Sequence, residues 1–85
     1  MGKKQSIPDK SKVKIDLGQF TKGEWEEVGI KNHKKYQGKI GVVTSLETYT
    51  ELGDKDFEYY NVTVQGLPEL VGISGYHLTP IKNGR

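Results

Sequence analysis

The sequence contains no cysteine among its 85 residues. The chain therefore has no disulfide framework and no thiolate metal site, and a single small domain must depend on its own core and hydrogen-bonded sheet. No apolar run approaches the roughly 18 residues of a membrane span, and residues 1–10 lack the apolar stretch of a signal peptide. We expect a cytoplasmic protein without a membrane partner.

A strong net charge is also lacking, because 13 basic residues nearly balance 11 acidic ones and leave a formal charge of +2. A charge this small does not by itself indicate a polyanion partner. Its distribution is uneven, since residues 1–39 hold ten lysines against five acids and residues 40–85 hold three basic residues against six acids. The two halves of a barrel interleave in space, so this asymmetry along the chain does not have to become a surface dipole.

The chain does contain a succession of short β-patterns separated by turn residues. Residues 11–17 carry apolar side chains at every second position, which is typical of a half-buried strand. Gly38 and Gly41 open a β-branched run and mark places where the backbone turns or comes close to another segment. Further strands are predicted at residues 39–50, 57–65, 69–74 and 78–81, with a tight turn or one turn of 3₁₀ helix at residues 75–77.

Two segments lack a strand pattern. Residues 18–37 have no clear periodicity, and Gly29 interrupts a short helical pattern over residues 24–30. We predict a long, partly packed loop there, pinned by Phe20 and Trp25. Residues 1–10 contain one isolated apolar residue and are predicted to be a flexible arm. The predicted plan is an arm at residues 1–10, a barrel at residues 11–82 and a tail at residues 83–85.

The order of these elements indicates an all-β fold, a small SH3-like barrel of about five strands with a long first loop. Residues 36–43, Tyr-Gln-Gly-Lys-Ile-Gly-Val-Val, resemble the centre of a KOW motif. That resemblance implies contact with RNA or a polymerase. The longer pattern from Val13-Lys-Ile15 to His77-Leu-Thr-Pro-Ile-Lys82 is similar to YorP-like proteins, small SH3-like barrels of phages and prophages. This second resemblance implies a fold and a phage or prophage source, and no reaction.

A basic cluster in the first loop is the candidate nucleic-acid site. Lysine side chains can contact phosphates while an interleaved aromatic ring stacks on a base. The alternative interpretation is a solvated lysine-rich loop, and the three glutamates of residues 24–27 would repel a polyanion if they lay on the same side. The candidates are Lys31, His33, Lys34, Lys35, Tyr36 and Lys39.

Aromatic residues form the candidate protein-binding site. SH3-like barrels often bind partners in an aromatic-lined groove between the long loop and the turn before the last strand, and we assign Trp25, Tyr49 and Tyr76 to such a groove. Acids of the second hairpin, among them Asp56 and Glu58, would then attract basic peptides. The alternative is that most of these rings pack the core or shield sheet edges.

Catalysis has little support in the sequence. His33 and His77 have no nucleophile or metal-ligand spacing around them. We therefore expect a non-catalytic interaction module without cofactor or metal, and we expect a monomer. A protein or peptide partner is the first hypothesis, and nucleic acid is the alternative.

Overall fold

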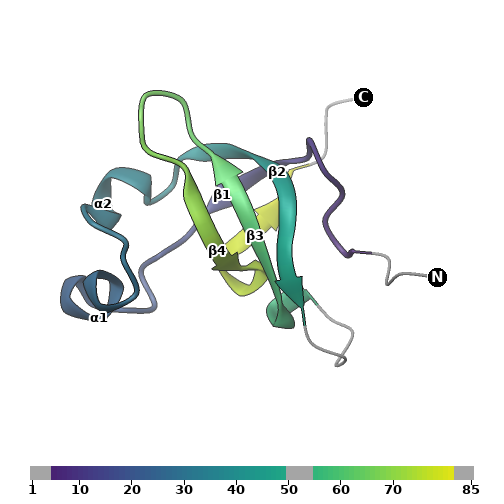
Figure 1. Ribbon diagram of the computed structural model, residues 1–85. Coiled ribbons are helices and arrows are strands. Elements are labelled where there is room, and N and C mark those ends of the chain that lie inside the picture. Colours follow the sequence, from purple (N-terminus) through teal and green to yellow (C-terminus); the bar gives the residue numbers. More distant parts are fainter. Residues whose placement is uncertain (1–4, 50–54, 82–85) are drawn as a thin grey trace.

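The fold is a single antiparallel sheet of five strands in the order β4-β3-β2-β1-β5 (Figure 1). The structure is a computed structural model that describes residues 5–49 and 55–81. The strands are β1 (Lys12–Ile15), β2 (Ile40–Tyr49), β3 (Glu58–Thr63), β4 (Leu70–Ser74) and β5 (Leu78–Pro80). This order, with β1 between β2 and β5, confirms the predicted small all-β barrel.

The long second strand, β2, pairs with a neighbouring strand on each side. β2 pairs with β1 at its beginning and with β3 over most of its ten residues, with register shifts between Val43 and Ser45 and between Leu46 and Thr48. Such irregularities increase twist and allow one strand to serve both parts of a barrel. Gly41 lies where β2 and β3 approach each other closely, since a Cβ built there would be 2.6 Å from Cγ1 of Val62.

Two 3₁₀ turns flank β3 and β4. The turn η2 (Gly75–His77) begins at Ser74, whose hydroxyl accepts the amide hydrogen of Tyr76, and it confirms the predicted one-turn connection. The other turn, η1 (Lys55–Phe57), packs against η2, where a Cβ on Gly75 would collide with the carbonyl of Lys55. The predicted hairpin turn before it falls mostly on residues 50–54, outside the described residues.

The first loop contains two short helices, α1 (Lys22–Glu27) and α2 (His33–Tyr36), so the prediction of a loop without helix is wrong. A capping box starts α1, because the Thr21 hydroxyl accepts from the amide of Glu24 and the Glu24 carboxylate accepts from the amide of Thr21. Both helices lie together to one side of the sheet (Figure 1). No helix among the described residues is long and apolar enough to cross a membrane.

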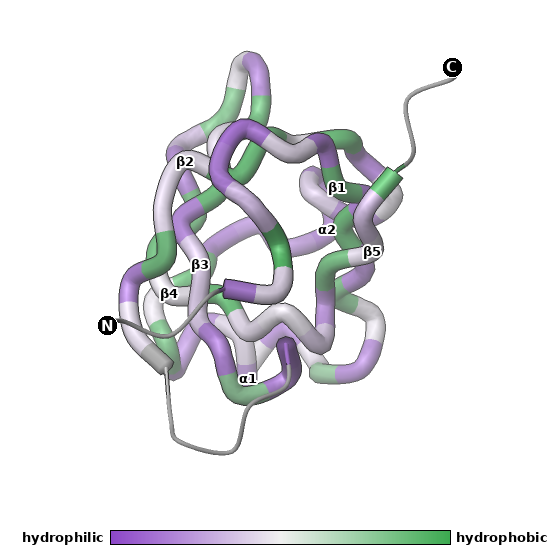
Figure 2. Tube along the Cα trace, turned by 90° about the vertical axis from the view of Figure 1, so that its right-hand side faces the viewer, coloured by the Kyte–Doolittle hydropathy of each residue, from purple (hydrophilic) through white to green (hydrophobic). Residues whose placement is uncertain are grey.

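The segment before β1 belongs to the packed unit. Ile7 is fully buried, and its amide donates to the hydroxyl of Tyr60 over 3.1 Å. The amide of Ser6 donates to the Glu58 carboxylate over 3.0 Å, and Lys10 joins β2 through the carbonyl of Val43. Figure 2 shows this stretch crossing the barrel on the side that faces the viewer. For residues 5–10 the expectation of a flexible arm is therefore wrong, because distant side chains supply partners that the local sequence does not reveal.

The core is formed by alternate residues of the strands together with side chains from the first loop. Its buried hydrophobic members are Ile7, Val13, Ile15, Leu17, Trp25, Tyr36, Val43, Tyr60, Val62, Val64, Leu70, Ile73 and Leu78. Ile30 and Leu67 pack against this core while remaining partly exposed. They lie at the boundary between the first loop and the β3–β4 turn, which is where the candidate site is found.

Candidate functional site

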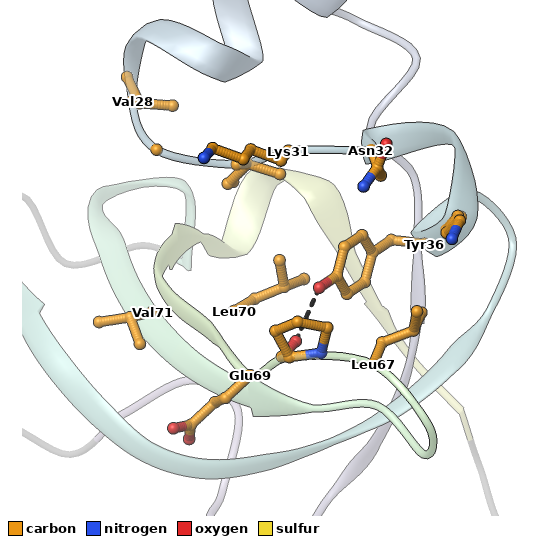
Figure 3. A pocket seen from close by; sticks show the side chains of 12 residues that line it. Val28, Lys31, Asn32, Tyr36, Leu67, Glu69, Leu70 and Val71 are labelled. Atoms are coloured by element: carbon orange, nitrogen blue, oxygen red, sulfur yellow. Dashed lines mark hydrogen bonds between the residues drawn. The ribbon is translucent and has the colours of Figure 1, made fainter.

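A cleft of about 630 Å³ lies between the α1–α2 segment and the turn that joins β3 to β4 (Figure 3). Residues 28–36 supply one wall and residues 67–71 the other. A volume of this size is in the range of pockets that hold a small ligand. The apolar part of the lining consists of Val28, Ile30, Tyr36, Leu67, Pro68, Leu70 and Val71.

One hydrogen bond joins the two walls of the cleft, and another fixes the chain within the helical wall. The hydroxyl of Tyr36 donates to the carbonyl of Pro68 over 2.7 Å, which joins α2 to the β3–β4 turn across one end of the cleft (Figure 3). Burial raises the pKa of Tyr36, so the hydroxyl keeps the proton that it donates. The amide of Ile30 donates to the carbonyl of Trp25 over 2.9 Å after Gly29 turns the chain at a φ of +90°. The cleft is therefore built before any partner arrives.

Exposed apolar side chains mark the rim of the cleft. Val28 is 66% exposed and Val71 is 62% exposed, whereas Leu70 in the floor is buried. Large exposed hydrophobic residues that gather around a hollow are more informative than the same residues scattered singly. Covering these side chains with a partner would remove apolar surface from water.

Charge is distributed unevenly around the cleft. Lys31 and Lys35 line the helical wall, and Glu69 lines the opposite one. The Glu69 carboxylate accepts a hydrogen bond from the hydroxyl of Thr44 over 3.0 Å and points away from Lys31 (Figure 3). The acid is thus directed toward β2, and the helical wall keeps its positive character.

Two further hollows adjoin α2 and are basic. One, of about 500 Å³, is lined by Lys34, Lys35, Lys39, Gln37, Gln65, Gly66 and Leu67. The other, of about 310 Å³, is lined by Lys22, Asn32, His33, Lys34 and Lys35. Among the residues that the structure describes, no acidic side chain lines either hollow, and Lys35 lines both of them as well as the cleft. The structure therefore brings the lysines of the predicted basic cluster together around α2, and the glutamates of α1 line none of the three hollows.

The other two members of the basic cluster are buried. His33 is 8% exposed and Tyr36 is 4% exposed. Because the Tyr36 ring packs in the core and its hydroxyl is bonded to Pro68, the expectation that this ring stacks on a base is wrong. Four exposed lysines, Lys31, Lys34, Lys35 and Lys39, remain of the predicted six residues.

Trp25, one of the three residues assigned to the predicted aromatic groove, is buried. Trp25 is 2% exposed, its indole N–H donates to the carbonyl of Leu17 over 2.7 Å, and its ring lies 4.9 Å from those of Phe20 and His77. Trp25 is thus a structural pin of the first loop, and its assignment to a partner-binding groove is wrong. Tyr76 is 55% exposed and contacts the His77 ring, while the side chain of Tyr49 lies outside the described part of the chain.

Of the acids expected to attract a basic peptide, Asp56 stays partly exposed beside Lys55, whereas Glu58 does not reach the surface. Glu58 is fully buried and accepts from the hydroxyl of Tyr60 and from the amide of Ser6. Burial and this carboxylate together raise the pKa of Tyr60 to about 12, so the phenol stays protonated. The expected role of Glu58 in attracting basic peptides is therefore wrong, because its carboxylate serves to hold the segment before β1.

Two further titratable residues near the first loop, His77 and Asp16, have structural partners. His77 is 5% exposed, with its Nδ1 3.0 Å from the side-chain oxygen of Gln19. Desolvation lowers the pKa of His77, partly opposed by the nearby Asp16 carboxylate. The side-chain amide of Gln37 and the amide of Gly18 bond to Asp16 and lower the pKa of its carboxyl. Within residues 5–49 and 55–81, no group of three or more His, Cys, Asp or Glu residues could hold a metal ion.

The apolar cleft residues were not predicted as a site. The spacing of these apolar residues along the sequence resembles that of any partly packed loop. Val28 and Val71 line one cleft only because the first loop folds onto the β3–β4 turn. One usable signal was present, since the spacing of Thr21 and Glu24 is that of a capping box and announces a helix in front of Val28.

Comparison of the chain with protein families, with curated proteins and with solved structures finds no match. The resemblances to KOW motifs and to YorP-like proteins therefore stay predictions.

Proposed function

We propose that this chain is a non-catalytic interaction module that binds an extended peptide segment of a protein partner in the cleft between residues 28–36 and residues 67–71. The observation that carries this proposal is the pair of exposed valines, Val28 and Val71, at the rim of a cleft whose floor is apolar. An extended segment could place its side chains between the two walls without a change in the fold, since the bond from Tyr36 to Pro68 already holds them.

A partner inside a host cell would agree with the resemblance to small barrels of phages and prophages. In that case the module would act in the cytoplasm by engaging a protein of the host. The proposed cleft replaces the aromatic groove expected from the sequence, because the ring of Trp25 is in the core.

Nucleic-acid binding is the second candidate function. The hollow lined by Lys34, Lys35 and Lys39 favours it, since three lysines without an acid among the lining residues can contact phosphates. The burial of Tyr36 weighs against it, because single-stranded nucleic acid is usually held by stacking as well as by charge. Affinity for mixed oligonucleotides that falls steeply with salt and is lost in a Lys34→Glu, Lys39→Glu double variant would support this alternative.

A displayed library of random peptides tests the primary proposal. The library is selected on the wild-type chain, and each enriched peptide is then measured against a Val71→Asp variant. Val71 is exposed, so its replacement leaves the core intact, while a carboxylate at the rim makes burial of the partner unfavourable. We expect a loss of affinity of about tenfold, which corresponds to roughly 1.4 kcal/mol, on the order of the burial of one valine side chain.

A Tyr76→Ala variant is the matched control. Tyr76 is also an exposed large side chain, and it lines none of the three hollows. Enriched peptides should bind this variant as they bind the wild type. Peptides that bind the Val71→Asp variant unchanged, or that lose affinity only in the Tyr76→Ala variant, would overturn the proposal.

A further inference from the structure

Four exposed lysines line the proposed peptide site or the basic hollow beside it. Lys31, Lys34, Lys35 and Lys39 are exposed, and none of them forms an ion pair with another residue that the structure describes. The nearest acid in the lining of the cleft, Glu69, is bonded to Thr44 and points away from Lys31. The positive charge on this side of the cleft is thus not neutralised within the described chain.

The apolar cleft and the basic hollow beside it are continuous through shared residues. Lys35 and Leu67 line both, so the apolar floor leads directly to the three lysines of the hollow, Lys34, Lys35 and Lys39. A segment that follows this course passes from an apolar environment to a positive one. Glu69 and Val71 lie at the other end of the wall formed by residues 67–71, and this wall contains no lysine.

We infer that the partner segment carries a run of apolar residues with a run of acidic residues on one side of it. The apolar side chains occupy the cleft, and the acidic ones lie over Lys34, Lys35 and Lys39. This inference rests on the proposed function and specifies the chemistry of the peptide. It is opposite to the charge preference expected from the sequence, in which acids of the second hairpin attract basic peptides. Of those acids Glu58 is buried, and neither Asp56 nor Glu58 lines the cleft.

Electrostatics in such an exposed site adds specificity and association rate more than affinity. Each exposed ion pair contributes about 0.2–1 kcal/mol and weakens as salt rises. Four lysines of one sign near one cleft attract an acidic segment before contact and repel a basic one. The apolar contacts then supply most of the affinity, and salt does not screen them.

Three synthetic probes of equal length test the inference on the full chain: leucines followed by aspartates, by serines or by lysines. Each probe is titrated by calorimetry into the wild type, a Lys35→Glu variant and a Lys12→Glu variant. Lys12 is an exposed lysine of β1 that lines none of the three hollows, so it controls for the change in net charge. Each probe is measured at low and at high salt.

We expect the leucine–aspartate probe to bind more tightly than the leucine–serine probe, and the leucine–lysine probe to bind most weakly. Lys35→Glu should weaken the aspartate probe about fivefold to tenfold and the serine probe by less than about twofold, since the lost ion pairs become repulsions. Lys12→Glu should change each of these affinities by less than about twofold.

The outcomes separate this inference from the proposed function. Equal affinity of the aspartate and serine probes, both weakened by Val71→Asp, would overturn the inference and leave the proposed cleft in place. An aspartate probe that binds with the same affinity when its leucines are replaced by serines would overturn both, because the site would then recognise charge alone. Tighter binding of an oligonucleotide than of the aspartate probe, with loss in the Lys35→Glu variant, would also overturn the inference in favour of nucleic acid.

Discussion

Gly41 illustrates how one residue constrains the barrel. A Cβ at this position would lie 2.6 Å from Cγ1 of Val62, 3.1 Å from the backbone oxygen of Thr63 and 3.2 Å from Cγ2 of Val64. Both valines are core residues, so β2 can lie this close to β3 only where it has no side chain. Gly38, three residues earlier, serves a different purpose, since its φ of +76° permits the turn out of α2.

We predict that Gly41→Ala lowers the free energy of unfolding by about 1–3 kcal/mol, because the added methyl group must displace core side chains or backbone. Urea denaturation measures this change. The control is Gly23→Ala in α1, where a Cβ meets nothing within 4 Å and where alanine favours the helix. An unfolding free energy for Gly41→Ala equal to that of Gly23→Ala would contradict the role of the close approach.

His77 couples the core of the first loop to pH. The ring contacts Trp25 at 4.9 Å, Phe20 at 5.6 Å and Tyr76 at 5.3 Å, and desolvation lowers its pKa below the ordinary value of 6.5. Asp16 and Asp56 favour the charged ring and Lys55 opposes it, but burial is the largest effect. The folded chain therefore binds a proton at His77 less readily than the unfolded chain does.

The sign of the pH dependence follows from this difference. As pH falls through about 6.5, His77 is protonated in the unfolded state but not yet in the folded state. The free energy of unfolding therefore decreases until the pH reaches the lowered pKa of His77 in the folded state. We predict that a His77→Gln variant, although less stable at every pH, loses part of this slope. Urea denaturation at intervals between about pH 5.5 and 7.5 measures both slopes. Identical slopes in the two proteins would show that His77 does not carry the effect.

At the scale of elements, the strands could be predicted from their residue pattern, whereas the clearest local signal for a helix was the capping box at the start of α1. Alternating apolar residues in β1 and the β-branched run of β2 determine their structure locally. In contrast, α1 has six residues and α2 has four, which is too short for a helix to be stable alone. They form because Thr21 caps α1 and because Trp25 and Tyr36 are drawn into the core.

The same distinction applies to the candidate site. The lysines of the first loop could be identified from the sequence, because exposed charge in a loop needs no tertiary information. Whether Trp25 and Tyr36 faced the core or a partner could not be read, since an aromatic residue among charges fits both interpretations. The cleft itself depends on the contact of two segments separated by about thirty residues, which only the folded chain displays.

Residues 5–10 are the clearest case of an element held by distant partners. Ile7 is fully buried, and the paired side chains of Glu58 and Tyr60 accept the amides of Ser6 and Ile7. Isolated in sequence, Ile7 gives no sign of these contacts. In the fold this segment completes the core on the side of the barrel away from α1 and α2 (Figure 1).

We predict that Ile7→Ala lowers the free energy of unfolding by about 2–5 kcal/mol, the usual effect of removing a large aliphatic side chain from a core. Chemical denaturation measures it, and Asp9→Ala, at an exposed position of the same segment, is the control with a change below about 1 kcal/mol. A loss for Ile7→Ala no larger than that of the control would mean that residues 5–10 are not part of the cooperative unit.

At the scale of the whole molecule, the segment that completes the core and the proposed binding cleft lie in different parts of the fold. The segment before β1 lies on one side of the sheet, and α1 and α2 lie on the other (Figure 1). The proposed cleft is lined by residues 28–36 and 67–71 and so lies on the side of the helices. The lysine-rich first part of the sequence does produce a local basic surface around α2, where Lys35 lines all three hollows. A peptide can thus reach the cleft without disturbing the segment that completes the core.

The most direct test of peptide binding in the cleft is an amide chemical-shift map of the ¹⁵N-labelled chain titrated with the tightest library-selected peptide. The account predicts that the largest shifts gather at residues 28–36 and 66–71, on the two walls of the cleft, and that Val71→Asp reduces them at equal peptide concentration. Largest shifts centred on η2 and Tyr76, or on the outer face of β1, with the two walls unchanged, would contradict it.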